Sequence, residues 1–258
     1  MHRLVAFVVL CGAVLASAED TSPRSTEWQG RIVGGMNAAS GQFPYQVSLT
    51  ASYQHFCGGA IIGDYWILTA GHCLIKRKPA EVTAVVGALT SAHGGFNYDV
   101  QQFIVHPNFN EWTQQNDVAI VRTKKAIHFN TAVFPVKMAR TYTPANRAVL
   151  ASGWGLTSLN VAKPADVLQF VALRTISNDD CTQRFHSLQN RVVTGSNLCT
   201  YSRTAQGTCM GDSGGPLVND GELVGLVSWG IPCAVGYPDV YVRVASFRAW
   251  ITAITGVY

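Results

Sequence analysis

Charged residues are scarce in this sequence of 258 residues. Asp, Glu, Lys and Arg make up 13% of the chain, against roughly 25% in an ordinary soluble protein, while hydrophobic residues make up 48%. This composition excludes an intrinsically disordered chain. The net charge is only +4, and the only basic clusters, residues 76–78 and 124–125, are too short to follow a nucleic-acid backbone. We interpret them as solvated loop charges and expect no nucleic-acid partner.

Long hydrophobic runs are also missing. The apolar run at residues 4–16 is shorter than the roughly 20 residues that a membrane-spanning helix needs, and no later run approaches that length. This run follows the basic residue Arg3 and ends at the small-residue pattern Ala-Ser-Ala of residues 16–18, which is typical of signal-peptide cleavage. We therefore predict a signal peptide at residues 1–18, a secreted, extracellular product and no membrane partner.

Closely spaced cysteine pairs and N-glycosylation sequons are absent, so we expect neither a zinc site nor N-linked sugar. Of seven cysteines, Cys11 lies in the predicted signal peptide. The other six are an even set in an oxidising compartment, which implies three disulfides whose pairing the composition leaves open. These six are Cys57, Cys73, Cys181, Cys199, Cys209 and Cys233.

Helical periodicity is scarce before the C-terminus. From Ile32 onward, short runs of β-branched and aromatic residues alternate with Gly, Asn and Pro, which predicts an all-β sandwich or barrel. Apolar residues at helical spacing from Phe247 to Ile254 predict a closing helix, with Ser246 as its N-cap. A second, short helix is expected to begin at Ser177. The predicted strands cover residues 44–49, 66–69, 82–86, 118–123, 148–153, 223–229 and 240–244.

No histidine follows Ser213, which lies in the pattern G-x-S-x-G at residues 211–215. Glycines there allow a sharp turn that exposes the serine hydroxyl, although a plain Gly-rich turn gives the same pattern. An α/β-hydrolase needs its acid and its histidine after the serine, so that fold is excluded. A catalytic histidine and acid must therefore precede Ser213.

His72 and Asp117 are the best candidates for these two roles. His72 follows an apolar strand and is next to Cys73, whose disulfide would fix the loop. Asp117 lies at the start of another apolar strand, where burial of a carboxylate is costly unless it is hydrogen-bonded or paired. The alternative for Asp117 is a plain turn or N-cap residue, and we interpret the other histidines of the mature chain as solvated rings.

Together these residues make the sequence similar to the chymotrypsin-like serine proteases over residues 31–258. The resemblance implies a catalytic domain at residues 32–258 that is all-β: two six-stranded antiparallel β-barrels with the active site between them, and a C-terminal α-helix. The boundary between the barrels is expected near residues 138–144. One departure is Gly71, where the family usually has alanine. The segments that carry the resemblance are residues 31–35, 69–73, 116–119, 153–155, 211–216 and 228–230.

The resemblance also assigns roles. His72 would be the general base, Asp117 would hold its tautomer, and the N–H groups of Gly211 and Ser213 would bind the oxyanion. Arg31 would end an activation propeptide at residues 19–31 that a trypsin-like protease removes. The new amine of Ile32 would then pair with Asp212, converting an inactive zymogen into the enzyme. The implied disulfides are Cys57–Cys73, Cys181–Cys199 and Cys209–Cys233.

A primary specificity pocket is implied by the same resemblance. Gly207 at its base, where trypsins have an aspartate, and Gly230 at its mouth favour a large apolar or aromatic P1 side chain, P1 being the residue whose carbonyl is cleaved. Asp239 replaces a family glycine, and its carboxylate would either accept P1 Lys or Arg or simply bind water or Thr208. This combination resembles the broad-specificity arthropod digestive enzymes of the brachyurin type. The implied pocket residues are Gly207, Thr208, Ser228, Trp229, Gly230 and Asp239.

These observations predict a secreted, monomeric digestive serine endopeptidase, active in the gut lumen on protein or peptide substrates and subject to protein protease inhibitors. No cofactor or metal is expected, because residues 87–98, which bind calcium in some family members, contain no Asp or Glu. Two alternatives stay open: a trypsin-like P1 preference through Asp239, and a non-catalytic homologue that acts as a binding module. Intact segments around His72 and Ser213 argue against the second.

Overall fold

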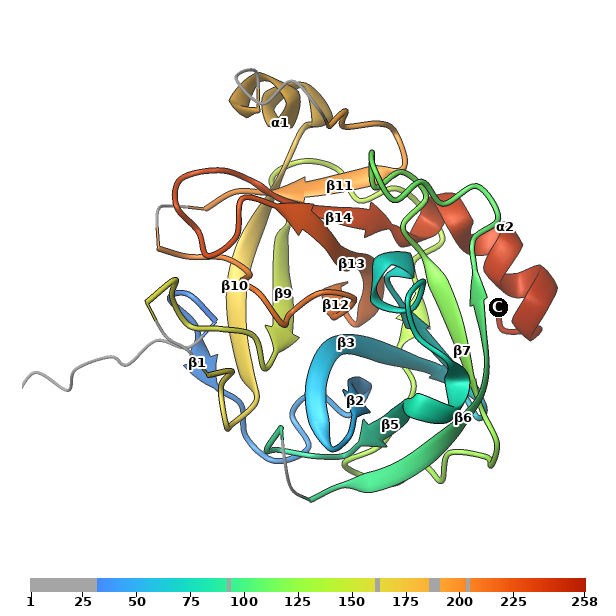
Figure 1. Ribbon diagram of the computed structural model, residues 1–258. Coiled ribbons are helices and arrows are strands. Elements are labelled where there is room, and N and C mark those ends of the chain that lie inside the picture. The colour runs from blue at the N-terminus through green and yellow to red at the C-terminus, as the bar shows by residue number, and fades with distance from the viewer. Residues whose placement is uncertain (1–31, 92–93, 161–162, 186–190, 203–204) are drawn as a thin grey trace, which may run out of the picture.

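The computed structural model describes residues 32–91, 94–160, 163–185, 191–202 and 205–258. The predicted signal peptide at residues 1–18 and the propeptide at residues 19–31, including Arg31, lie outside the described residues. Strands dominate the rest of the chain and form two groups, one above the other in Figure 1. No helix in these ranges is long and apolar enough to span a membrane.

The first barrel is a closed antiparallel ring of six strands, in the order β2-β3-β4-β7-β6-β5. Side chains that alternate inward, such as Val47, Leu49, Ile67 and Val121, fill its interior and are fully buried. The strands are β2 (Gln46–Ala51), β3 (Gln54–Gly63), β4 (Trp66–Thr69), β5 (Thr83–Val86), β6 (Phe96–Val105) and β7 (Ala119–Thr123).

The second barrel closes through the pairing of β9 with β10, in the order β9-β10-β11-β14-β13-β12. Two short strands attach to it, β1 (Met36–Asn37) along β10 and β8 (Lys137–Met138) along β13. Two six-stranded barrels, as the resemblance implies, are thereby confirmed. The strands are β9 (Ala148–Gly153), β10 (Gln169–Ile176), β11 (Asn197–Thr200), β12 (Pro216–Asn219), β13 (Glu222–Gly230) and β14 (Asp239–Arg243).

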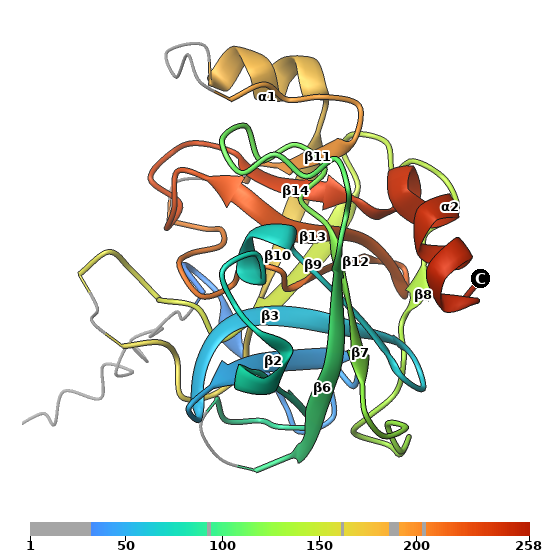
Figure 2. The same ribbon diagram turned by 45° about the vertical axis from the view of Figure 1, so that its right-hand side comes forward.

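The C-terminal helix α2 (Val244–Thr255) covers the side of the molecule where the barrels meet (Figures 1 and 2). Its buried residues Phe247 and Ile251 share one hydrophobic cluster with Leu68 of the first barrel and Leu226 of the second. The predicted apolar face is therefore correct. The predicted N-cap, Ser246, is wrong, because the helix begins directly after β14 with Arg243 as its N-cap residue, so Ser246 lies within the first turn.

Shorter helices complete the chain. Helix α1 (Asn178–Arg184) begins as predicted, since the Ser177 hydroxyl accepts a hydrogen bond from the Asp180 N–H. Two 3₁₀ turns, Gly71–Cys73 and Pro79–Glu81, follow β4. The six cysteines are paired as the resemblance implies: Cys57–Cys73, Cys181–Cys199 and Cys209–Cys233.

Candidate active site

His72 and Asp117 form a tightly bonded pair at the edge of the first barrel. The 3₁₀ turn after β4 carries His72, whose Nδ1 lies 2.7 Å from Asp117 Oδ2, while its backbone N–H donates to Asp117 Oδ1 over 2.8 Å. The Asp117 side chain is fully buried, and that of His72 is 24% exposed. Because a carboxylate only accepts, this contact assigns the proton to Nδ1 and leaves the lone pair of Nε2 free.

A third hydrogen bond to Asp117 comes from the second barrel. The Ser228 hydroxyl, on β13, donates to Asp117 Oδ2 over 2.6 Å. Three donors therefore satisfy the buried carboxylate, which removes the cost that makes an unpaired buried Asp improbable. Ser228 was predicted as a pocket residue, and it lines the pocket as well as holding Asp117. The plain turn-residue interpretation of Asp117 is wrong.

Ser213 lies in a loop that both barrels hold. Its carbonyl accepts a 2.7 Å hydrogen bond from the Gly58 N–H of β3, and the next residue, Gly214, donates to the Val227 carbonyl of β13 over 2.8 Å. Gly214 has a φ of +74°, and a Cβ there would lie 2.2 Å from the Thr69 hydroxyl, so only glycine fits.

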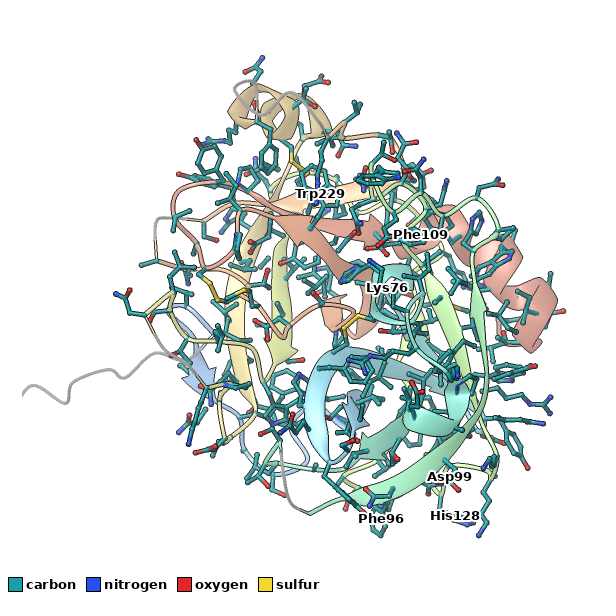
Figure 3. All side chains as sticks on the ribbon, viewed as in Figure 1. Lys76, Phe96, Asp99, Phe109, His128 and Trp229 are labelled. Atoms are coloured by element: carbon teal, nitrogen blue, oxygen red, sulfur yellow. A yellow bond between two sulfur atoms is a disulfide. The ribbon has the colours of Figure 1, made fainter. Side chains whose placement is uncertain are left out.

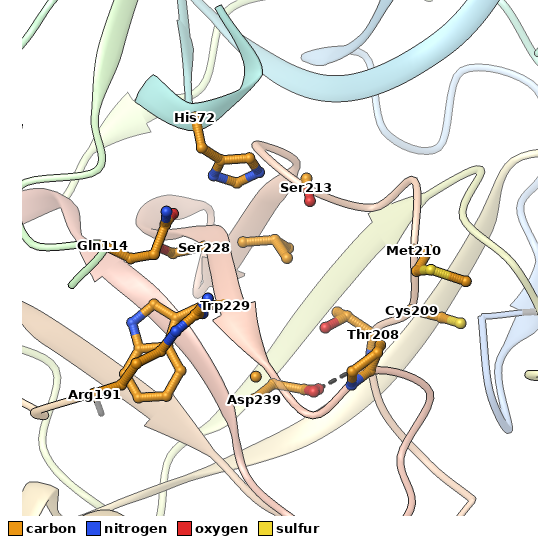
Figure 4. A pocket seen from close by; sticks show the side chains of 13 residues that line it. His72, Gln114, Arg191, Thr208, Cys209, Met210, Ser213, Ser228, Trp229 and Asp239 are labelled. Carbon is orange, nitrogen blue, oxygen red and sulfur yellow. Dashed lines mark hydrogen bonds between the residues drawn. The ribbon is translucent and has the colours of Figure 1, made fainter. Parts of the chain in front are cut away.

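The His72 ring lies beside Ser213 at one end of a pocket that both residues line (Figure 4). Within the described residues the Ser213 hydroxyl makes no hydrogen bond to His72 Nε2. Such bonds are often long in a free enzyme and shorten when substrate binds. The structure therefore brings His72, Asp117 and Ser213 together, with only the last contact left to form.

Two backbone N–H groups next to Ser213 are available to an oxyanion. In the described part of the chain, the N–H groups of Gly211 and Ser213 donate to no other protein group. The Gly211 carbonyl is held elsewhere, because it accepts a 2.9 Å hydrogen bond from His55 Nε2. With φ at +97°, Gly211 adopts a backbone conformation that suits glycine.

His55 is a residue that the sequence reasoning missed. The expectation of a solvated ring is wrong for His55, because its ring packs at a tilt against Trp154, with ring centroids 5.6 Å apart, and its Nδ1 forms a 2.8 Å hydrogen bond with the Ser48 hydroxyl. Burial lowers the pKa of His55, so its neutral form, with the proton on Nε2, holds the Gly211 carbonyl. No pattern around His55 in the sequence distinguishes it, because its partners come from β2 and from the Ser213 loop.

Asp212, between Gly211 and Ser213, is buried, and its hydrogen bonds within the described residues come from backbone N–H groups alone. Its two carboxylate oxygens accept from the N–H groups of Gly155, over 2.8 Å, and Cys209, over 3.0 Å. Burial raises the pKa of Asp212 to about 7, and these two hydrogen bonds oppose the increase. Ile32 is fully buried in the core of the second barrel, and the next residue, Val33, bridges to Gly207.

The pocket beside Ser213 has a volume of about 270 Å³ and runs down to Asp239 (Figure 4). Thr208, Trp229 and Gly230 line it as predicted, whereas Gln114 and Arg191 are lining residues that were not predicted. The disulfide residue Cys209 forms part of the wall. An open-mouthed pocket of this size next to Ser213 can hold one substrate side chain.

Gly207 does not line this pocket itself. It lies behind Asp239, since a Cβ on Gly207 would come within 2.7 Å of Asp239 Oδ2. The carboxylate of Asp239 thus occupies the space in which a side chain at position 207 would lie. The Gly207 and Asp239 pair is a single feature: the glycine makes room for the carboxylate.

The environment of Asp239 is unusual for a carboxylate. It is 7% exposed, and Oδ2 accepts a 2.8 Å hydrogen bond from the Thr208 N–H. Burial raises the pKa of Asp239 to about 7, the hydrogen bonds from Thr208 lower it, and the charge of Asp212 raises it further. The base of the pocket therefore changes from neutral to negative around neutral pH.

Metal ligation is limited by the disulfides. Among the described residues, the group of three possible metal ligands is Cys57, Cys73 and His72, and the two cysteines are bonded to each other. Their thiolates are not available to a metal ion.

Comparison with known proteins decides the family. The family model described as Trypsin matches residues 32–251. The chain belongs to the trypsin family. It is 40% identical to Chymotrypsin-2 of Vespa crabro over 221 residues, which are 85% of this chain and 98% of the relative. It is 35% identical to Trypsin 5G1 of Aedes aegypti over 254 residues, 95% and 94% of the two chains. Trypsin delta of Drosophila melanogaster is 34% identical over 252 residues, 96% and 98%.

The family and these relatives establish the chain as a serine endopeptidase with protein substrates. The relatives include one named chymotrypsin and several named trypsins, so their names leave the P1 preference of this trypsin-family protease open. The P1 preference therefore has to be inferred from the residues of the pocket, and from Asp239 in particular.

Proposed function

We propose that this protease cleaves peptide bonds through an acyl-enzyme on Ser213, with His72 as general base and Asp117 as its support. The observation that carries the proposal is the contact between the Asp117 carboxylate and the His72 ring beside Ser213, together with two N–H groups of the Ser213 loop that have no acceptor among the described residues. A serine hydroxyl is a weak nucleophile until a neighbouring base takes its proton. His72 Nε2, with its lone pair free, is that base.

In the first half of the reaction, Ser213 Oγ attacks the substrate carbonyl carbon while its proton passes to His72 Nε2. The negative charge that develops on the carbonyl oxygen accepts hydrogen bonds from Gly211 and Ser213 N–H. Buried Asp117 stabilises the imidazolium. The C–N bond then breaks, His72 gives the proton to the leaving amine, and an ester of Ser213 remains.

In the second half, water attacks this ester. His72 takes a proton from the water as it adds, and the same two N–H groups bind the oxyanion again. The bond between the acyl carbon and Oγ then breaks, and the proton returns to Oγ. The products are a carboxylic acid and the free Ser213 hydroxyl.

We infer that the chain is made as an inactive precursor. Asp212 is a buried carboxylate with two backbone donors and no cationic partner in the described residues. Cleavage after Arg31 by a trypsin-like protease would create an amine on Ile32, whose side chain is buried in the second barrel. An ion pair between that amine and Asp212 would stabilise the loop that carries Gly211 and Ser213.

We further propose a broad P1 specificity. The open mouth at Gly230 and the apolar walls accept large apolar side chains, and Asp239 at the base accepts Arg or Lys when it is ionised. The Thr208 N–H occupies only Oδ2 of this carboxylate. Oδ1 stays available to a guanidinium or ammonium group.

A secreted digestive role, in the gut lumen and as a monomer that protein inhibitors can block, agrees with the predicted signal peptide and with the names of the insect relatives. Three disulfides suit an extracellular environment.

Covalent labelling tests the catalytic assignment. The chain, activated by trypsin, should react with an organophosphate and add one phosphoryl group, which peptide mapping should place on Ser213. Ser213→Ala should remove the label and lower kcat by about 10⁶-fold, leaving only the contribution of the oxyanion site. A non-catalytic binding module would give no label, and that outcome would refute the proposal.

A further inference from the structure

A second hollow adjoins His72 and Ser213 on the side away from Asp239. We name it the leaving-group hollow; its volume is about 460 Å³, and its walls include the Cys57–Cys73 disulfide, Phe56, Lys76 and Arg77. None of these residues lines the P1 pocket. His72 and Ser213 line both spaces, so a peptide that reacts at Ser213 lies across them.

The position of the His72 ring shows which part of a substrate enters this hollow. Cys73 Sγ lies 3.8 Å from His72 Nε2, the atom that gives its proton to the leaving amine in the proposed mechanism. The acyl side of the substrate has its P1 side chain in the other space, above Asp239. Residues after the cleaved bond therefore extend from Nε2 along the disulfide towards Phe56 and Arg77.

Arg77 is held in place by an aromatic contact. Its guanidinium carbon lies 3.7 Å from the centroid of the Phe56 ring, and Phe56 packs against the core of the first barrel. Stacking on a fixed ring reduces the conformational freedom that a surface arginine otherwise loses on binding. The planar fork of the guanidinium stays free to bind a carboxylate with two hydrogen bonds.

Two cationic side chains line the hollow, and only one of them is ion-paired within the described residues. Lys76 forms an ion pair with Glu111, on the loop before β7, whereas Arg77 forms no ion pair within the described residues. The carboxylate of nearby Glu81 accepts a hydrogen bond from the backbone N–H of Lys78. In Figure 3, Lys76 lies near the junction of the barrels, while Asp99 lies at the far edge of the first barrel. Arg77 also borders a separate hollow that Glu81 and Asp99 line, but within the described residues no carboxylate pairs with its guanidinium. Arg77 therefore brings an unpaired positive charge to the leaving-group hollow.

We propose that Arg77, stacked on Phe56, forms a subsite for a substrate carboxylate on the leaving-group side of the cleaved bond. The carboxylate belongs either to a Glu or Asp side chain or to the C-terminus of a short leaving peptide. This proposal rests on the proposed function, and it gives a specific role to one residue of a basic cluster that the sequence suggested was only solvated.

The test uses the activated full chain and quenched fluorescent peptides that share one acyl part with P1 Phe. The second residue after the cleaved bond is Glu, Gln or Lys, and a further set has a leaving dipeptide with a free or an amidated C-terminus. Arg77→Gln removes the charge. Lys78→Gln is the matched control, because Lys78 is an adjacent exposed cation that does not line the hollow.

We expect kcat/KM to be about tenfold higher for Glu than for Lys in the parent, the size of one charge-assisted contact at a partly exposed site. The ratio should fall to within about twofold in Arg77→Gln and stay unchanged in Lys78→Gln. Faster cleavage of the dipeptide with a free C-terminus than of its amide, lost in Arg77→Gln, would show that the subsite also binds a terminal carboxylate. Equal rates for Glu and Lys in the parent, or an unchanged ratio in Arg77→Gln, would overturn the proposal.

An anilide with the same acyl part and no residue after the cleaved bond separates this proposal from the proposed function. Both variants should cleave it at the parental rate, which also shows that they fold. Failure of the parent to cleave it would count against the proposed function. In that case, calorimetric binding of the Glu and Lys peptides to Ser213→Ala protein, with and without Arg77→Gln, still decides whether the hollow selects a carboxylate.

Discussion

Asp239 makes the substrate preference of this protease depend on pH. Because burial raises its pKa to about 7, the base of the P1 pocket is mostly neutral at pH 6 and mostly negative at pH 8. A P1 Arg needs the negative form, whereas a P1 Leu does not. The groups around it are Asp212, whose charge raises the pKa, and Tyr241, whose own pKa is raised well above its usual value and which stays neutral.

The size of the effect follows from the ionised fraction. A group with a pKa of about 7 is roughly 10% ionised at pH 6 and roughly 90% ionised at pH 8, so the ratio of kcat/KM for Arg over Leu should rise about ninefold. Taking the ratio for two substrates removes any pH effect on the catalytic steps that both substrates share. Asp239→Asn keeps an oxygen for the Thr208 N–H but loses the charge. It should lower cleavage after Arg by about 30-fold or more at pH 8, since truncating one partner of a buried charge pair costs roughly 2–5 kcal/mol.

The assay measures kcat/KM between pH 5.5 and 8.5 on two peptides that differ only at P1. Asp220→Asn, at an exposed turn between β12 and β13, is the matched control and should behave as the parent. Folding gives a second measurement. A carboxyl whose pKa is raised in the folded state binds more protons there than in the unfolded chain, so stability falls as pH rises from about 4 to 7. Asp239→Asn should weaken that fall. A flat Arg-to-Leu ratio in the parent, or an equal slope in Asp239→Asn, would refute the reasoning.

Three further predictions concern the loop of Ser213. His55→Leu should lower kcat about 100-fold with little change in KM, because the Gly211 carbonyl loses its hydrogen-bond donor. His55→Gln can still donate a hydrogen bond and should restore part of the rate. Equal losses of kcat in both variants would contradict a positioning role for His55. Gly58→Ala should abolish organophosphate labelling at Ser213, because a Cβ at position 58 would lie 2.8 Å from Gly215 Cα and displace the loop that carries Ser213. Thermal melting should still show a folded protein. Normal labelling would show that the loop can accommodate the added methyl group. Activity should fall at alkaline pH as the Ile32 amine loses its proton. Pairing with Asp212 raises the pKa of this amine above its free value of about 8. The ion pair therefore stabilises the enzyme fully below about pH 8, and this stabilisation is lost as the pH rises through the raised pKa of the amine. Activity that survives acetylation of this amine would exclude the ion pair.

The site shows how far local sequence patterns reach. His72, Asp117 and Ser213 stand in short segments that can be recognised without a fold, because the residues next to each of them in the chain form a characteristic motif. Gly58 and His55 have no such neighbour. Their partners, Ser213 and Gly211, lie far along the sequence, and the contact exists only because β3 of the first barrel packs against a loop of the second.

The fold shows the same division. The predicted runs correspond to β2, β4, β5, β7, β9, β13 and β14, whereas β3, β6, β10, β11 and β12 were not predicted. In β3, Gly58 and Gly59 interrupt the pattern of β-branched and aromatic residues. Both glycines are required by close backbone and side-chain neighbours from other strands, which no local pattern records. The apolar face of α2 was predicted from its periodicity, yet its start was not, because the start depends on how β14 leaves the sheet.

By itself, the sequence determined the class of chemistry, the candidates that we propose as base, acid and nucleophile, and the cysteines available for disulfides, since these depend on which residues are present and in what order. Only the tertiary structure decided that Gly207 makes room for the Asp239 carboxylate, that Ser228 supports Asp117, and that Arg77 stacks on Phe56 beside the nucleophile. These are distances between strands and loops of a folded chain. Burial then sets the pKa of each carboxyl group, and a linear sequence records neither the distance nor the burial.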